Sequence, residues 1–283
     1  MKKYILLLAA FAAMTMSSCN DVSDNEDITT QNLTGYFNYV TKLETNETTI
    51  TTGASYTVEY NYSTNKADII VNNLRLPNTD YPGFTFSGAK WEYDENWKVV
   101  YKASTVPTAI NYYNVPTFTD FTFSLYDEYY TATGSTESQY IPRTVISFIV
   151  DGYKVISRPT TPIFTATSVI ASSTAATTST NPVYVFTLDL EDMKLAIAVN
   201  SFVLADGTSM NAVALNKIPF TIDGETISFS RENFKSEMIG YDGDEYKYDV
   251  SALSGKYDGK SFELTYDITV EGVKNEISAT ANY

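Results

Sequence analysis

The residues in this sequence best suited to recognising a ligand are a few aromatic side chains between positions 97 and 130. Trp97 closes a polar turn, Tyr112 and Tyr113 lie in a loop between two prolines, and Tyr129 and Tyr130 lie in a second polar loop. A tyrosine or tryptophan ring offers a flat apolar face and a hydrogen-bonding group, which suits stacking on a sugar ring or packing against a protein. These five residues are the predicted ligand-binding set, although tyrosine-rich segments are also common in β proteins without such a role.

A second group consists of acidic residues near glycine and turn positions. Asp242-Gly243-Asp244-Glu245, with Asp249 nearby, places oxygen ligands around a glycine and could hold calcium, and Asp189, Glu191 and Asp192 form a similar patch. Neither group has the ligand spacing of a calcium-binding loop. The sequence therefore favours solvated turns at both places and predicts no metal site.

Several reaction classes are excluded by residue types that the chain lacks. It contains no histidine and a single cysteine, Cys19. These absences exclude a Ser-His-Asp triad, a Cys-His nucleophile, a zinc site of cysteine and histidine ligands, and a disulfide within the chain. A glycosidase needs only two carboxylates, but the spacing singles out no such pair. We therefore expect no catalysis and no cofactor.

Cys19 has a different expected role, because it follows a segment typical of export signals. Lys2 and Lys3 give a positive start, residues 4–13 are apolar and too short to span a bilayer, and small residues precede the cysteine. The pattern predicts a lipoprotein signal peptide over residues 1–18 and lipidation of Cys19, which would anchor the protein to a membrane. A plain signal peptide with an incidental cysteine is the alternative.

The residues after Cys19 are acidic and have no core-forming pattern. Residues 20–27 carry four acids and no base, and residues 19–34 as a whole are predicted to be a solvated tether. The complete chain has 34 acidic and 19 basic residues, a formal net charge of −15, so nucleic acid is not an expected partner. The tether resembles the surface-export signal of Bacteroidota lipoproteins, which implies display on the cell surface, whereas an acidic tether that serves only solubility is the alternative.

The rest of the chain contains the same pattern twice. Residues 56–62 match 184–190 and residues 69–76 match 197–204, both at an offset of 128, while 35–40 match 162–167 at an offset of 127. Two homologous domains explain this self-similarity. We expect the first domain at residues 35–158, a linker at 159–161 and the second domain at 162–283.

Within each repeat the dominant period is two, as in strands with one buried face. In the first repeat it predicts eight strands, near residues 36–41, 55–63, 67–76, 83–93, 97–103, 119–126, 143–151 and 153–157. Only residues 231–238 look capable of a short helix. The predicted fold is all-β, two tandem antiparallel domains of about eight strands each, with an up-and-down barrel favoured over a sandwich.

The repeat also helps to separate core residues from functional ones. Trp91 aligns with Phe220 and is expected in the core, whereas Trp97 aligns with the charged Glu225 and is not explained by a shared core. The first repeat holds 15 of the 23 tyrosines and both tryptophans. We therefore expect recognition in the first repeat, with Tyr56, Tyr60 and Tyr62 filling its interior.

The export signal, Cys19, the acidic tether and the segment Tyr-Asp-Gly-Lys-Ser-Phe-Glu-Leu-Thr-Tyr at residues 257–266 together resemble Bacteroidota cell-surface lipoproteins with calycin-like, or lipocalin-like, β-barrel domains. The resemblance implies barrels and a lipid-anchored position at the outer membrane. The expected function is non-catalytic binding of an extracellular ligand, preferably a glycan, through aromatics of the first repeat. The alternatives are a structural or adhesive protein that binds a protein partner, and a carrier of a small apolar molecule.

Overall fold

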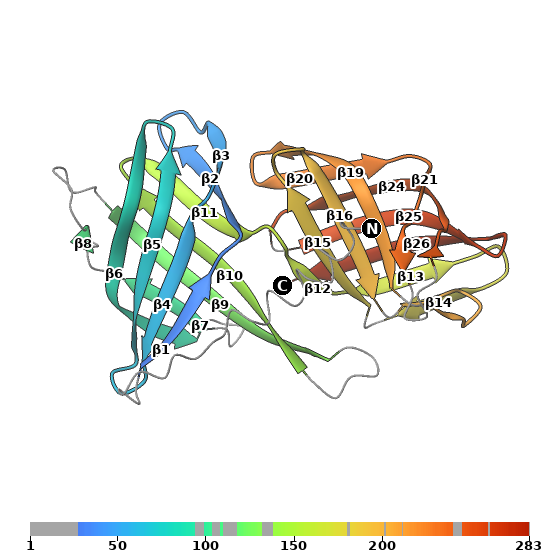
Figure 1. The fold of residues 1–283 in the computed structure, drawn as a ribbon, viewed down its shortest axis with the longest axis horizontal. Helices are drawn as coiled ribbons and strands as arrows, with labels where there is room; N and C mark the ends of the chain where they lie inside the picture. The colour runs from blue at the N-terminus through green and yellow to red at the C-terminus, as the bar shows by residue number, and fades with distance from the viewer. Residues whose placement is uncertain are drawn as a thin grey trace. The chain divides into compact units, whose positions relative to one another are not determined.

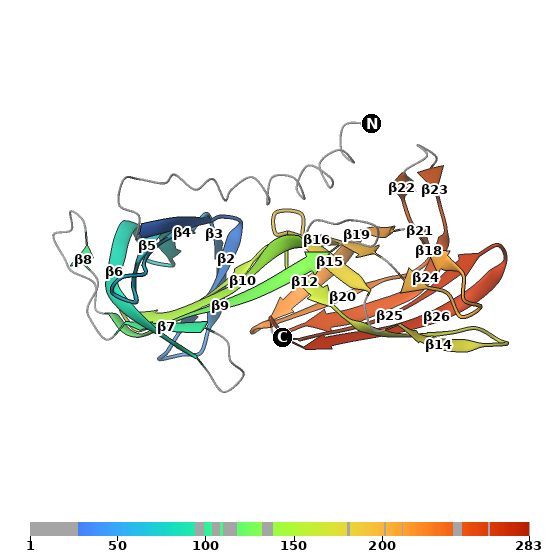
Figure 2. The same cartoon turned by 90° about the horizontal axis from the view of Figure 1, so that it is seen from below.

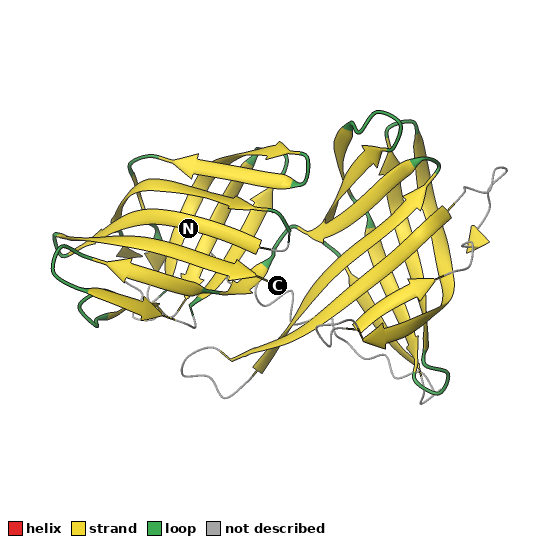
Figure 3. Ribbon diagram, turned by 180° about the vertical axis from the view of Figure 1, so that it is seen from behind, coloured by secondary structure: helices red, strands yellow, loops and turns green. Residues whose placement is uncertain are grey.

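The computed structural model describes residues 28–93, 99–103, 108–109, 118–131, 138–179, 182–200, 202–210, 212–239, 245–259 and 261–282. Every regular element in these residues is a β-strand (Figure 3). The chain divides into two compact units, one that ends at Pro159 and one that starts at Thr160. The all-β, two-domain prediction is therefore confirmed.

The first unit contains one antiparallel sheet of eleven strands, drawn from blue to green in Figure 1. Its strands are β1 (Ile28–Leu33), β2 (Tyr36–Lys42), β3 (Thr48–Thr52), β4 (Ser55–Asn61), β5 (Lys66–Leu76), β6 (Thr79–Tyr93), β7 (Val99–Ala103), β8 (Thr108–Ala109), β9 (Phe118–Thr131), β10 (Ser138–Val150) and β11 (Tyr153–Pro159). Neighbouring strands follow the order β1-β4-β5-β6-β7-β9-β10-β11-β2-β3, and β8 pairs with β6 off this path.

The second unit contains a sheet of the same size and two small hairpins. Its strands are β12 (Ile163–Thr165), β13 (Thr167–Ala171), β14 (Ala176–Ser179), β15 (Val183–Asp189), β16 (Lys194–Asn200), β17 (Phe202–Val203), β18 (Ser209–Met210), β19 (Val213–Asp223), β20 (Thr226–Arg231), β21 (Phe234–Lys235), β22 (Met238–Ile239), β23 (Glu245–Tyr246), β24 (Asp249–Tyr257), β25 (Ser261–Val270) and β26 (Val273–Asn282). The main sheet follows the order β12-β15-β16-β19-β20-β24-β25-β26-β13-β14, and β17–β18 and β22–β23 pair separately.

Each main sheet curls on itself. As a result, its first two strands, which are nearly continuous in the chain, pair with strands from distant parts of the same sheet. In the first unit β1 pairs with β4 while β2 pairs with β11, and only Thr34 and Gly35 separate β1 from β2. Gly35 has φ 73°, a left-handed conformation that glycine adopts without steric cost. Ala166 takes the same place between β12 and β13 in the second unit. Each unit is therefore a barrel-like, curled sheet (Figure 2).

The two sheets have the same strand order, and their register tests the residue-by-residue match. Tyr56 pairs with Val71 in one unit and Tyr184 with Val199 in the other, which confirms the offset of 128. The predicted match between residues 35–40 and 162–167 is wrong. Residues 163–165 form β12, the counterpart of β1, and the counterpart of β2 is β13. Both segments contain two adjacent apolar residues followed by a polar and another apolar residue, and this shared pattern does not indicate the break between β12 and β13.

The structure also corrects the expected list of elements. All eight strands predicted in the first unit are present, but β1, β3 and the short β8 are additional. β1 occupies residues that the sequence assigned to the acidic tether at 19–34. Residues 231–238 form no helix, because the chain there contributes the end of β20, then β21 and the start of β22.

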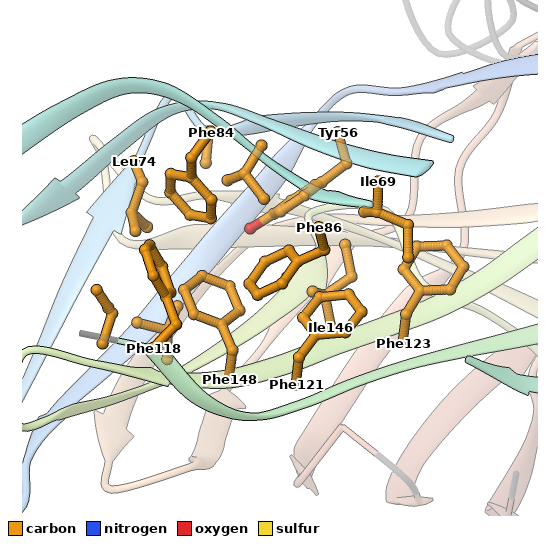
Figure 4. Close-up of a cluster of buried hydrophobic side chains, with 14 of the residues drawn as sticks. Tyr56, Ile69, Leu74, Phe84, Phe86, Phe118, Phe121, Phe123, Ile146 and Phe148 are labelled. Atoms are coloured by element: carbon orange, nitrogen blue, oxygen red, sulfur yellow. The ribbon is translucent and has the colours of Figure 1, made fainter. Parts of the chain in front are cut away.

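Aromatic side chains dominate the core of the first unit (Figure 4). The rings of Phe86 and Phe121 stack with centroids 3.9 Å apart, and those of Phe84 and Phe118 lie 4.5 Å apart. Phe148 is fully buried and contacts all four of these rings. A core filled by interlocking rings leaves little room at this level for an enclosed apolar cargo.

Each core also contains a buried polar cluster around an equivalent tyrosine. The Tyr56 hydroxyl donates to Asn38 Oδ1 at 3.1 Å and bonds Ser157, while the Tyr184 hydroxyl lies 2.9 Å from Ser168 Oγ. Burial raises the pKa of Tyr184 to about 12 and also raises the pKa of Tyr56. Both phenols therefore stay neutral at physiological pH and serve as packed hydrogen-bonding groups rather than as acid–base groups.

Candidate functional site

The ligand-binding residues predicted from sequence fall mostly outside the described part of the chain. Trp97, Tyr112 and Tyr113 lie outside it, as does Cys19. Tyr129 and Tyr130 belong to β9 and pair with Tyr140 and Gln139 of β10, but only their backbone is described. The predicted ligand-binding set therefore stays a prediction that the described residues do not test.

A different group of aromatic residues lies at one end of the first unit. Tyr60 ends the buried column of β4 that begins with Tyr56 and Val58, and Tyr62 follows directly after the strand. Side chains two residues apart point to the same face of a strand. Tyr60 and Tyr62 therefore continue the inner face of the sheet beyond the packed core.

A β-bulge brings two further aromatics to the same face. The pairing of β5 with β6 shifts between Ala67 and Ile69, and Gly88, with φ 65°, lies in the bulged segment of β6. The Gly88 amide donates to Asp68 Oδ1 at 2.6 Å, which fixes the irregularity. An extra residue of this kind reverses which face later side chains occupy. Ala89 is thereby buried, and Trp91, two residues later, packs against the core.

These four residues, Tyr60, Tyr62, Trp91 and Tyr93, are called the aromatic rim below. Tyr60 and Tyr62 stack at 6.4 Å with an angle of 18° between their planes, and Trp91 meets Tyr93 edge to face at 5.4 Å. In each pair the inner ring packs against the core, whereas the outer ring is exposed, Tyr62 by 64% and Tyr93 by 54%. In each pair of the aromatic rim, a ring packed against the core therefore supports a ring that is open to solvent.

Polar groups accompany the rings at this end of the sheet. Tyr60 donates its hydroxyl proton to Gln31 Oε1 at 3.0 Å, and Gln31 belongs to β1, which pairs with β4. Tyr60 also contacts the buried Tyr101 at 5.8 Å, and Tyr101 lies opposite Trp91 in the pairing of β6 with β7. β4 and β6 flank β5 (Figure 1), so the two ring pairs lie on either side of one strand. Flat rings with hydroxyl and amide groups can stack on a sugar ring and hydrogen-bond its hydroxyls.

Sequence reasoning assigned Tyr60 and Tyr62 to the barrel interior, and for Tyr62 this is wrong. The period of two marks which face a side chain takes, but it does not mark where the packed interior ends. One signal was available: Tyr62 is followed by Ser63, Thr64 and Asn65, which form the turn before β5. Asn65, with φ 52°, adopts the left-handed conformation that such turns require.

Of the two acidic patches, the one at Asp189 forms a turn, whereas Glu245 and Asp249 of the other belong to β23 and β24. Asp189 Oδ1 accepts backbone protons from Glu191 at 3.1 Å and Asp192 at 3.0 Å. Asp249 forms an exposed ion pair with Lys235 at 2.8 Å, while Asp242 and Asp244 lie outside the described residues. Within the described ranges, no group of three acidic, cysteine or histidine side chains is placed to hold a metal ion.

Comparisons with known proteins give no family. No protein-family model and no curated protein sequence matches the chain. Nor does the described part of the chain contain a helix long and apolar enough to cross a bilayer.

Among solved structures, one from Bacteroides fragilis, provisionally described as an outer membrane protein, is 8% identical, covers 89% of this chain and 96% of its own, and gives a TM-score of 0.36. A double mutant of transferrin-binding protein B from Haemophilus parasuis is 7% identical, with coverage of 89% and 76% and a TM-score of 0.25. The transferrin-binding protein B of Neisseria meningitidis serogroup B is 9% identical, with coverage of 86% and 68% and a TM-score of 0.24. Scores this low do not establish a common fold.

Proposed function

We propose that this protein is a lipid-anchored surface protein that binds an extracellular glycan, without catalysis, through the aromatic rim of its first unit. The observation that carries the proposal is the exposure of Tyr62 and Tyr93 at the end of two inner-face columns whose other members are buried or half-buried. Leaving large rings in water forgoes the free energy of their burial, so exposed rings supported by a rigid core favour a binding role.

The chemistry of the rim supports a sugar over other ligands. Each ring pair offers an apolar face bordered by a hydroxyl or an indole N–H, and Gln31 adds an amide next to Tyr60. The packed core below the rim supports a site at the end of the sheet rather than an enclosed cargo site. Trp97, which the sequence predicts as a ligand-binding residue, lies outside the described residues, and its role stays a separate prediction.

Removing an exposed rim ring should weaken glycan binding while the fold stays intact. A glycan array on residues 20–283 would first identify a ligand, and the dissociation constant would then be measured for Tyr62→Ala and Tyr93→Ala. We expect each substitution to cost about 1–3 kcal/mol of binding free energy, because stacking contacts at binding hot spots have this size. The melting temperature should change little, because both side chains are exposed.

Leu43→Ala is a matched control for these variants. Leu43 is 46% exposed and directly follows β2, which continues from β1, whereas Tyr62 directly follows β4, which runs antiparallel to β1. The two residues therefore lie at opposite ends of the sheet. Removal of the Leu43 side chain should leave glycan affinity unchanged. Equal affinity of Tyr62→Ala, Tyr93→Ala and the parent would remove the rim from the site, and capture of a protein with no glycan bound would favour the adhesive alternative.

Anchoring at the outer membrane rests on Cys19 alone and has its own test. Cys19→Ala removes the thiol that would be acylated, so the protein should move from the membrane fraction to the soluble fraction. Protease accessibility on intact cells would then report surface exposure of the parent. Unchanged membrane retention of the Cys19→Ala variant would contradict the lipid anchor without affecting the binding proposal.

A further inference from the structure

A hollow of about 330 Å³ opens at one end of the second unit. It lies between the β17–β18 hairpin and the turn that joins β25 to β26. Its apolar wall includes Leu204, Met210 and Val273, and its polar side includes Asp206, Glu271 and Tyr248. The volume is at the lower end of the range of small-ligand sites.

The duplication explains why this space is empty of side chains. Leu74 pairs with Tyr81 in the first unit, and the corresponding pair in the second unit is Phe202 with Met210. Likewise, Val150 pairs with Tyr153 across the β10–β11 turn, and Val270 pairs with Val273 across the β25–β26 turn. Two tyrosines of the first unit are therefore replaced by a methionine and a valine in the second.

In the first unit these two tyrosines link the β5–β6 hairpin to the β10–β11 hairpin. The Tyr81 ring is buried and its hydroxyl donates to the Asp151 carboxylate, while Asn78 Nδ2 donates to the Tyr153 hydroxyl at 3.1 Å. Glu271 takes the place of Asp151 in the second unit, where methionine stands in place of its tyrosine partner. The second unit therefore retains an acidic residue at the position of Asp151 but lacks both tyrosine rings.

The hollow is held open by the backbone around it. Asn275, buried to 2% exposure, accepts the Ala205 amide proton on Oδ1 at 3.3 Å and donates from Nδ2 to the Val273 carbonyl at 3.3 Å. The first bond joins the β17–β18 hairpin to β26, and the second, within β26, orients the Asn275 amide. A site formed in this way is preorganised, which reduces the ordering cost of binding.

The charge of the lining has one sign. Asp206 and Glu271 are acidic, and none of the eleven residues that line the hollow is lysine or arginine. Hydrogen bonds from Thr208 hold the pKa of Asp206 below its usual value, so this carboxylate is ionised at neutral pH. Partial burial and the charge of Glu271 raise the pKa of Tyr248, which keeps its hydroxyl a neutral donor and acceptor.

We propose that this hollow binds an alkylammonium group, with the methylenes against Leu204, Met210 and Val273 and the cation near Glu271 and Asp206. The group can come from a free primary amine or from a lysine side chain of a partner protein. An acidic, preformed and partly apolar site complements both features of such a ligand. This site is independent of the aromatic rim, since it belongs to the other unit.

Calorimetric titration of residues 20–283 with n-pentylammonium, and with n-pentanol as a neutral analogue of the same length, tests the proposal. Pentylammonium should bind, and pentanol should bind about tenfold more weakly or not at all, because it lacks the charge. Glu271→Gln should weaken pentylammonium binding about tenfold. Val273→Tyr restores a ring of the first unit and should abolish binding by filling the hollow.

Glu263→Gln is the matched control, because Glu263 is an exposed acid of β25 that pairs with Lys256 outside the hollow. It should leave pentylammonium affinity unchanged. A blocked lysine peptide distinguishes the sources: its binding indicates a protein partner, and its exclusion while pentylammonium binds indicates a free amine. Equal binding of pentanol and pentylammonium, or affinity unaffected by both Glu271→Gln and Val273→Tyr, would overturn the proposal, and Tyr62→Ala should leave amine binding intact whatever its effect on glycans.

Discussion

Phe148→Ala should lower the free energy of unfolding of the first unit by about 3–5 kcal/mol. Phe148 is fully buried, and its ring lies between 5.7 and 6.4 Å from the rings of Phe84, Phe86, Phe118 and Phe121. Truncation therefore loses the buried ring area, the edge-to-face contact with Phe84 and the tilted contacts with the other three rings, and it leaves a cavity among them. Urea denaturation followed by tryptophan fluorescence measures this unit specifically, because Trp91 and Trp97 both precede Pro159.

Two further substitutions make this measurement specific to packing. Phe148→Leu keeps most of the apolar volume and should cost about 1.5 kcal/mol or less. Leu43→Ala, at an exposed site, should stay within about 0.5 kcal/mol of the parent. A loss below about 1 kcal/mol for Phe148→Ala would contradict a rigidly packed ring cluster.

The second large effect is expected from adding atoms rather than removing them. Gly255 in β24 pairs with Phe229 of β20 on one side and Leu264 of β25 on the other. A Cβ atom at position 255 would lie 2.6 Å from the Glu263 carbonyl oxygen and 2.6 Å from the Phe229 ring. The Phe229 side chain can rotate only by leaving the core, and the Glu263 carbonyl is fixed in the β24–β25 ladder.

Gly255→Ala should therefore destabilise the second unit by about 1–3 kcal/mol, and Gly255→Val by more, as overpacking of a well-filled core does. Differential scanning calorimetry would follow the transition of this unit. Ser254→Ala, at the exposed neighbouring position, is the control and should have little effect. Adding Phe229→Leu to Gly255→Ala should recover part of the loss, because it removes the ring contact and leaves the carbonyl contact. Parent-like stability of Gly255→Ala would show that the strand can shift to accommodate a methyl group.

The elements that sequence reasoning identified are those with strong local signals. β25 alternates Phe262, Leu264, Tyr266 and Ile268 with polar residues, and its buried positions are these four. β1, with the sequence Ile-Thr-Thr-Gln-Asn-Leu, has no such signal, and only Leu33 of its residues is buried. β1 exists because it pairs with β4 along all six of its residues, and a long-range pairing of this kind is not visible in a local pattern.

The candidate site also depends on features of the assembled sheet that a local sequence pattern does not contain. Tyr56 and Tyr62 belong to one alternating column and look equivalent in the sequence, but one is 1% exposed and the other 64%. The bulge at Gly88, which sets the face of Trp91, likewise depends on pairing with β5. The difference depends on where the packed core stops, which is a property of the assembled sheet. The hollow of the second unit likewise depends on strand register, which sets Met210 and Val273 at the positions of Tyr81 and Tyr153.

The way in which each barrel is completed also determines when it can form. β2, near the start of the first unit, pairs with β11 at its very end, and buried Asn38 and Ser157, which bond each other, are 119 residues apart in the chain. Contacts between residues so far apart in the sequence stabilise the unit only after all of it is present. Topologies dominated by such contacts fold slowly. During synthesis the chain emerges N-terminus first, so the first unit can form its whole sheet once Pro159 has been made. The second unit needs β26, and its unpaired strand edges stay exposed until that strand has been made. β26 is therefore the last strand that the second unit needs for assembly, and truncations within β26 should cause misassembly more readily than truncations before β1.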